Sequence, residues 1–172
     1  DQVDIPETGV VTSLLLNRVA EIGAQRPAIW ILADSRSGLG RFSSVCWKMN
    51  RDELSRMTNS IDITDLARIQ ELAREMAQRN GRHVFVTLSE QGIVGASPFG
   101  DVEHVPAPAP SGPIDIVGAG DCVTANITTA LAAGASLRES LEVATAAAFL
   151  VIQQLGTTGA ATPDAISALL VK

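Results

Sequence analysis

The 172-residue chain has very few aromatic side chains: Phe and Trp together make up 3% of it, and tyrosine is absent. Its hydrophobic core must therefore be built from Ala, Val, Ile and Leu. Basic residues are also scarce, because 13 Lys and Arg stand against 19 Asp and Glu, giving a net charge of −6. Surfaces that bind nucleic acids or anionic membranes are rich in basic residues, so the charge balance argues against both partners. Backbone amides can still bind a phosphate locally.

Signals for membranes, export and metals are missing as well. The sequence contains no run of 18 apolar residues and no signal-peptide pattern, so we expect a cytoplasmic protein. Cys46 and Cys122 lie far apart in apolar surroundings and form no CxxC pair, which favours reduced thiols over a disulfide. His83 and His104 are isolated, which favours structural or surface roles over zinc binding.

Hydrophobic periodicity predicts alternating helices and strands. Helical spacing of apolar residues predicts helices over 10–25, 51–57, 64–79, 119–133, 137–154 and 163–171. Apolar runs predict strands over 28–34, 44–50, 83–89, 92–97 and 114–117, with one more short strand in the proline-rich segment 98–113. This order predicts an α/β domain with a mostly parallel sheet, in which a tight hairpin makes strand 92–97 antiparallel.

The segment PIDIVGAGDCV (113–123) places a glycine turn, Gly118-Ala119-Gly120, directly before a helical pattern with Asp121 in its first turn. N–H groups at the start of a helix bind phosphates, so this arrangement predicts an anion site. A dinucleotide fingerprint would need a small residue where Val123 stands and a strand after the helix, where another helix is predicted. The simplest alternative is a tight turn before a core helix, in which the negative charge of Asp121 interacts favourably with the helix dipole.

A carboxylate beside an anion site suits phosphoryl transfer to an alcohol. DIVGAGDCV (115–123) resembles the Asp-Thr-x-Gly-Ala-Gly-Asp signature of the ribokinase (pfkB) family of sugar kinases. WKMNRDEL (47–54) resembles that family's Lys-Pro-Asn-x-x-Glu stretch, and VFVTLSEQGIVG (84–95) resembles its Thr-x-Gly-x-x-Gly stretch. The tail 130–158 is similar to kinase domains that act on heptose phosphate.

The resemblance implies a ribokinase-like three-layer α/β/α fold and an ATP- and Mg²⁺-dependent kinase for a sugar or sugar phosphate. In that family Asp121 would be the general base, and the amides of Gly118, Ala119 and Gly120 would stabilise the charge on the transferred group. Asp115 and the GTTG stretch (156–159) would help to bind a monovalent cation such as K⁺.

The resemblance also assigns the nucleotide and metal sites. Asn50 and Glu53 would orient Mg²⁺ and the phosphates, partly through water. Without the family, Glu53 would be read as a solvated acid in the first turn of a helix. The nucleotide would be bordered by the Ala-rich helix 137–154 (Ala144, Ala146, Ala147, Ala148) and by Thr87, Ser89, Gly92 and Gly156.

Three residues depart from the family motifs: Ile116 replaces Thr, Ser89 replaces Gly, and Met49 replaces Pro. The first two support a different class of function, a non-catalytic nucleotide-binding or regulatory module of the same fold. Family members are nearly twice as long, and their N-terminal half supplies a lid and the sugar-binding residues. We therefore expect residues 1–172 to be a single nucleotide-binding domain that lacks that part and associates as a homodimer.

Overall fold

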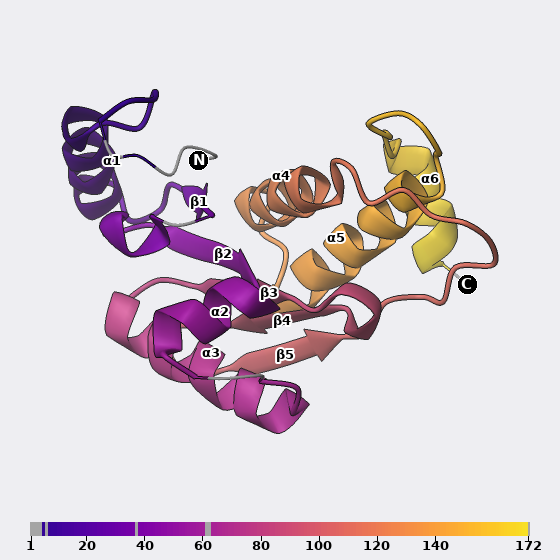
Figure 1. The fold of residues 1–172 in the computed structure, drawn as a ribbon, viewed down its shortest axis with the longest axis horizontal. Coiled ribbons are helices and arrows are strands. Elements are labelled where there is room, and N and C mark those ends of the chain that lie inside the picture. The colour runs from indigo at the N-terminus through magenta and orange to yellow at the C-terminus, as the bar shows by residue number, and fades with distance from the viewer. Residues whose placement is uncertain (1–4, 6, 37, 61–62, 172) are drawn as a thin grey trace. The chain divides into compact units, whose positions relative to one another are not determined.

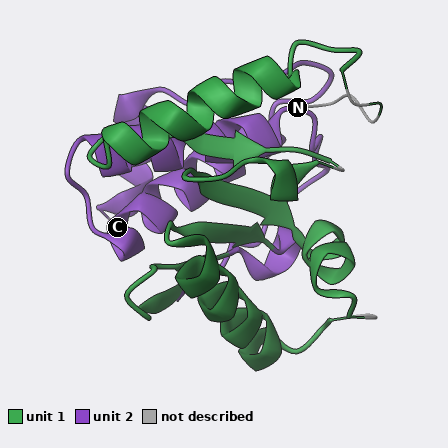
Figure 2. Ribbon diagram, turned by 90° about the vertical axis from the view of Figure 1, so that its left-hand side faces the viewer, with its two compact units in different colours: residues 1–87, 94–103 green, residues 88–93, 104–172 purple. Residues whose placement is uncertain are grey.

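The computed structural model describes residues 5, 7–36, 38–60 and 63–171, which divide into two compact units. Unit 1 comprises residues 1–87 and 94–103, and unit 2 comprises residues 88–93 and 104–172 (Figure 2).

Three helices of unit 1 begin at side chains that cap their first turns. They are α1 (Ser13–Gln25), α2 (Arg51–Thr58) and α3 (Leu66–Asn80) (Figure 1), and their N-caps are Thr12, Asn50 and Asp65. The end predicted for α3 is confirmed, since Gly81 follows it in the left-handed conformation with φ of 68°. The other two helices also lie within a few residues of their predicted bounds.

The sheet has five strands in the order β1-β2-β3-β4-β5: β1 (Leu32–Asp34), β2 (Cys46–Asn50), β3 (Val84–Thr87), β4 (Ile93–Ala96) and β5 (Val102–Val105). β2 is parallel to both β1 and β3. Only residues 88–92 and 97–101 join the last three strands, and such short links connect antiparallel neighbours. The sheet is therefore mixed rather than mostly parallel.

The β3–β4 connection is longer than the predicted two-residue hairpin. It contains a single-turn 3₁₀ helix, η2 (Ser89–Gln91), and the amide of Leu88 donates to the carbonyl oxygen of Gly92 at 2.8 Å. A second 3₁₀ helix, η1 (Leu39–Arg41), precedes β2. Each is a single turn within a loop, closed by a local hydrogen bond.

Two predicted strands differ from the structure. The run 28–34 is a strand only over its last three residues, because the Ile29 amide donates to the carbonyl oxygen of Arg26 in a turn. The run 114–117 is not a strand: the amide of Asp115 donates to the carbonyl oxygen of Ile152, and Val117 donates to the Asp115 side chain. Ile116 is 72% exposed, so its apolar character does not reflect a buried ladder.

Unit 2 contains the three C-terminal helices, α4 (Ala119–Ala132), α5 (Leu137–Ile152) and α6 (Pro163–Leu170), near their predicted bounds. Figure 1 shows α4 alongside α5, and α5 and α6 share a core cluster. Ala144, Ala146 and Ala147 are buried, whereas Ala148 is half-buried. Three of the four alanines expected beside a nucleotide therefore serve close helix packing.

The core of unit 1 confirms that aliphatic residues supply most of the packing. Met49, Leu54, Ile69 and Val86 are fully buried, with Phe85 as the one fully buried aromatic residue among those described. Cys46 and Cys122 are free thiols, as predicted. Among the described residues, no helix combines the length and apolar character needed to cross a bilayer.

Candidate functional site

The three parallel strands of unit 1 end in polar residues. Asp34 ends β1, Asn50 ends β2 and Thr87 ends β3. In the register, Asp34 lies opposite Lys48, and Asn50 lies opposite Thr87. Since alternate residues of a strand share a face, these four residues belong to one face of the sheet. Ligands of α/β proteins bind at the carboxyl ends of parallel strands, which makes this edge a candidate site.

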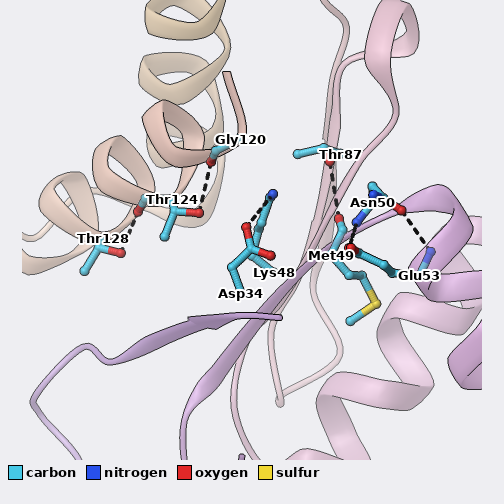
Figure 3. A network of polar contacts seen from close by, with 9 residues as sticks. All are labelled: Asp34, Lys48, Met49, Asn50, Glu53, Thr87, Gly120, Thr124 and Thr128. Carbon is cyan, nitrogen blue, oxygen red and sulfur yellow. Dashed lines mark hydrogen bonds and ion pairs between the residues drawn. The ribbon is translucent and has the colours of Figure 1, made fainter. Parts of the chain in front are cut away.

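Asn50 and Glu53 form a reciprocal pair at the start of α2 (Figure 3). The Glu53 amide donates to Oδ1 of Asn50 at 2.9 Å, and the Asn50 amide donates to Oε2 of Glu53 at 2.7 Å. This is a capping box, which satisfies two amides that have no partner within the helix. Glu53 is only 7% exposed while Asn50 is exposed, so the reading of Glu53 as a solvated acid is wrong.

Thr87 lies beside this pair in β3. Its hydroxyl donates a long hydrogen bond, 3.4 Å, to the carbonyl oxygen of Met49 (Figure 3). Thr87 is half-buried. Unit 1 thus brings together three of the residues selected from sequence: Asn50, Glu53 and Thr87.

Lys48 and Asp34 form an ion pair on the same sheet face. Nζ of Lys48 lies 2.8 Å from Oδ2 of Asp34 (Figure 3). The two partners differ in environment, because the Lys48 side chain is 7% exposed and the Asp34 side chain is 26% exposed. The ammonium depends on its partner for charge compensation, whereas the carboxylate still contacts solvent.

The β3–β4 hairpin carries the other two residues of the predicted Thr-x-Gly-x-x-Gly stretch. Ser89 is exposed and adopts φ of 54°, a left-handed conformation that is uncommon for a residue with a Cβ. Gly92 is buried at φ of 89°, and a Cβ there would lie 2.0 Å from the carbonyl oxygen of Val105. Glycine is therefore required at position 92 by both conformation and space.

The glycine turn of unit 2 begins α4. Gly118 is its N-cap at φ of 82°, and Asp121 stands exposed in the first turn. The amide of Ala119 donates to the carbonyl oxygen of Ile116 at 3.1 Å, so it is already engaged in this structure. The amides of Gly120 and Asp121 precede the first helical hydrogen bonds and are the positions from which a helix start binds an anion.

The start of α4 continues into a series of threonine back-bonds. The Thr124 hydroxyl donates to the carbonyl oxygen of Gly120 at 3.0 Å, and Thr128 donates in the same way to Thr124 (Figure 3). The contact from Thr124 fixes the peptide that follows Gly120, and with it the orientation of the Asp121 amide.

Asp115 joins the glycine turn to the loop after α5. Its Oδ1 accepts from the Val117 amide at 3.0 Å, and its Oδ2 accepts from the Gly156 amide at 3.1 Å. Each oxygen of Asp115 thus binds one backbone amide. Unit 2 brings Asp115, Gly156 and the residues 118–121 together.

Cys122 follows Asp121, but its environment argues against a nucleophilic thiolate. Burial raises the pKa of the Cys122 thiol, with a smaller opposing effect from a hydrogen bond with the Asn126 side chain. Burial also raises the pKa of Cys46, to about 11. Both thiols therefore stay protonated near neutral pH. The described residues contain no cluster of three or more His, Cys, Asp or Glu side chains that could hold a metal by themselves.

Sequence reasoning did not select Asp34 and Lys48 for the site. The signal available was the acid at the end of the apolar run AIWILAD (28–34), which is typical of a strand whose end lies beside a ligand. The Lys48 partner could be found only from the strand register, because the two residues lie 14 positions apart.

Comparisons with known proteins agree with these motifs. The model of the pfkB family carbohydrate kinases matches residues 44–165. The bifunctional protein HldE of Gluconacetobacter diazotrophicus is 31% identical over 157 residues, which cover 91% of this chain and 32% of that protein. The chain thus spans about a third of the length of that curated relative.

Solved structures with the same fold include two sugar kinases. Escherichia coli phosphofructokinase-2 in complex with potassium superposes with a TM-score of 0.74 at 26% identity, over 91% of this chain and 53% of that one. Arabidopsis thaliana ribokinase complexed with ribose and ATP gives a TM-score of 0.79 at 22% identity, over 92% and 52%. The fold is therefore ribokinase-like, and the chain covers about half of each solved kinase.

Proposed function

The chain belongs to the pfkB family of carbohydrate kinases, and on this premise we propose that it takes part in the ATP-dependent phosphorylation of a hydroxyl group on a sugar or sugar phosphate. The observation that carries the proposal is the turn at Gly118, which opens α4 with a left-handed glycine and places Asp121 in the first helical turn. This is the segment that resembles the family signature most closely.

In the proposed reaction the acceptor oxygen forms a bond to the γ-phosphorus of ATP while the bond from that phosphorus to the bridging oxygen of ADP breaks. Asp121 accepts the proton that leaves the acceptor hydroxyl. The helix-start amides of Gly120 and Asp121, with that of Gly118, donate to the oxygens of the transferred group. Ala119 contributes only if its amide leaves the Ile116 carbonyl oxygen, to which it is bound here.

The family context adds Mg²⁺, which neutralises the phosphates of bound ATP. Glu53 and Asn50 would hold the ion, directly or through water. Their chemistry fits this ion, because Mg²⁺ prefers oxygen ligands and commonly uses one or two carboxylates together with substrate phosphates. The capping box uses Oε2 of Glu53 and Oδ1 of Asn50, and a carboxylate has further lone pairs to offer.

A monovalent cation is a further part of the proposal. Potassium is bound in the solved E. coli phosphofructokinase-2, a structural relative of this chain. Asp115 would contribute to such a site with the lone pairs that Val117 and Gly156 leave available. Thr87, Ser89, Gly92 and Gly156 would border the nucleotide.

The similarity of the tail 130–158 to kinase domains that act on heptose phosphate suggests a heptose phosphate as the acceptor. Family members hold the acceptor with residues outside the portion to which these 172 residues correspond. Positioning supplies much of the rate in phosphoryl transfer, so we expect the 172 residues alone to bind nucleotide without sugar-dependent turnover. Self-association, as a homodimer, is also part of the proposal.

A non-catalytic nucleotide-binding module is the second candidate function. Ile116 removes the hydroxyl that the family signature carries next to the turn, and Ser89 places a Cβ in the loop that would border the nucleotide. Retention of Asp121 and of a buried Glu53 favours the kinase.

Isothermal titration calorimetry tests the shared premise. ATP with Mg²⁺ should bind, and NADH should bind more weakly; tighter binding of NADH would contradict both candidates. Release of ADP in the presence of a panel of sugars and sugar phosphates then separates them, with the protein in its longest natural form. Sugar-dependent release supports the kinase, and ATP binding without it supports the module.

A further inference from the structure

The side chain of Gln154 closes the loop that joins α5 to α6. Its Nε2 donates to the carbonyl oxygen of Ala160 at 2.8 Å and to that of Leu150 at 3.1 Å. Its Oε1 accepts from the amide of Ala160 at 3.2 Å. The side-chain amide of Gln154 thus binds both the carbonyl oxygen and the backbone amide of Ala160. These two bonds close the neck of the loop 155–159.

The closed loop contacts Asp115 and the glycine turn, at one point each. The Gly156 amide donates to Oδ2 of Asp115, and the Thr158 methyl group lies so close to Gly118 that a Cβ there would be 2.7 Å away. At the neck, a Cβ on Gly159 would lie 2.7 Å from the carbonyl oxygen of Val151. These contacts leave little room for the loop to slide along α5.

We infer that Gln154 is a positioning residue for the anion-binding turn. By clamping Ala160 it holds the loop 155–159, and the loop holds Asp115 and Gly118, from which α4 and its helix-start amides begin. This inference rests on the proposed function, because it assigns an anion to the turn. A displacement of about 1 Å at such a site is enough to weaken binding and catalysis substantially.

Gln153 offers a matched control. Its Nε2 donates to the carbonyl oxygen of Phe149 at 2.9 Å, the same bond four residues back that Gln154 makes with Leu150. Both residues lie at the end of α5, and within the described part of the chain the Gln153 side chain makes no hydrogen bond to the loop. Gln153→Ala therefore removes a helix-end bond alone, whereas Gln154→Ala removes that bond and the clamp.

The first measurement is amide hydrogen exchange without nucleotide. Gln154→Ala should speed exchange at the amides of Val117 and Gly156, whereas Gln153→Ala should leave them near the wild-type rates. Equal rates in the two variants would show that the clamp does not hold the turn and would overturn the inference. This measurement is independent of any activity.

The second measurement is binding of Mg²⁺-ATP and of adenosine by calorimetry. Gln154→Ala should weaken ATP binding about tenfold relative to Gln153→Ala, the equivalent of one or two hydrogen bonds, and weaken adenosine binding less. If the clamp only stabilised the fold, its removal would lower the melting temperature without changing the affinity of the folded protein for ATP. An equal loss for both ligands, or no loss, would therefore contradict a role at the anion site.

Gln154→Glu keeps the size and the Oε1 acceptor but removes the amide donors. This variant replaces Gln154→Ala in the binding measurement if the alanine variant does not fold. It should reproduce the loss of ATP affinity. Failure of the wild-type protein to bind ATP would reject the proposed function and the inference with it. Normal ATP binding by wild-type, Gln154→Glu and Gln153→Ala would reject the inference alone.

Discussion

Asn50 and Glu53 each accept a hydrogen bond from the other's backbone amide, at 2.9 and 2.7 Å. The two residues proposed to orient Mg²⁺ are therefore also the residues that start α2. Any substitution at this pair affects the stability of the helix as well as the binding of Mg²⁺, so the two effects must be separated by the choice of variant.

Glu53→Gln separates them because the amide oxygen of Gln can still accept from the Asn50 amide while the charge is lost. We expect the free energy of unfolding in urea to change little and Mg²⁺-dependent ATP binding to fall. Glu53→Ala should lose both, with about 1 kcal/mol of stability lost with the cap.

Glu139→Ala is the matched control for the cap, since Glu139 occupies the same position in the capping box that starts α5. It should leave ATP binding unchanged. Undiminished Mg²⁺ dependence in Glu53→Gln would remove Glu53 from the metal site.

Asp121→Asn should reduce sugar phosphorylation by roughly 10²–10⁴-fold, the usual contribution of a general base, while ATP affinity stays within a few fold. The amides that would bind phosphate are unchanged, and the base acts only in the transition state. Steady-state assays of the longest natural form, with calorimetry, check both halves.

Asp164→Asn is the corresponding control, because Asp164 lies in the first turn of α6 and has the same favourable interaction with a helix dipole. Its turnover should equal that of the wild type. Full activity of Asp121→Asn would eliminate Asp121 as the base.

Gly118→Ala should destabilise the protein by about 1–3 kcal/mol, because a Cβ at φ of 82° is strained and would also clash with Thr158. Gly134→Ala measures the strain alone, since Gly134 has φ of 92° and open space around it. Urea unfolding of the two variants should show a larger loss for Gly118→Ala. Equal losses would mean that Thr158 moves aside at no cost.

Removing Asp34 and removing Lys48 from their ion pair should lower the stability of the protein by different amounts. Asp34→Asn leaves a buried ammonium without its carboxylate, which typically costs about 3–5 kcal/mol. Lys48→Met leaves a carboxylate that is partly in water and fills the same space with an apolar side chain, so we expect a smaller loss. Denaturation of both variants at neutral pH gives the comparison; a larger loss for Lys48→Met would show that Asp34 depends more on the pair than its exposure suggests.

Sequence reasoning predicted most of the helices because their boundaries are marked locally. Asn80-Gly81 ends α3 and Thr162-Pro163 begins α6, and such caps act within a few residues. The strand predicted over 114–117 is wrong because hydrophobic periodicity shows which side chains are apolar but not whether other residues cover them. Ile116 is 72% exposed and Val117 is 59% exposed.

The candidate site was predicted in part for the same reason. Motifs along the chain selected Asn50, Glu53 and Thr87, which the fold of unit 1 brings together. The pair of Asp34 and Lys48 depends on which strands are neighbours, and the clamp at Gln154 depends on where a loop returns. Neither relationship is encoded in a local pattern of residues.

Ser89 occupies a backbone conformation that favours a different residue. Its backbone has φ of 54°, a conformation that suits the glycine found at this point of the family motif better than it suits serine. The β3–β4 hairpin therefore carries a conformational cost at Ser89, and a glycine at this position would remove that cost.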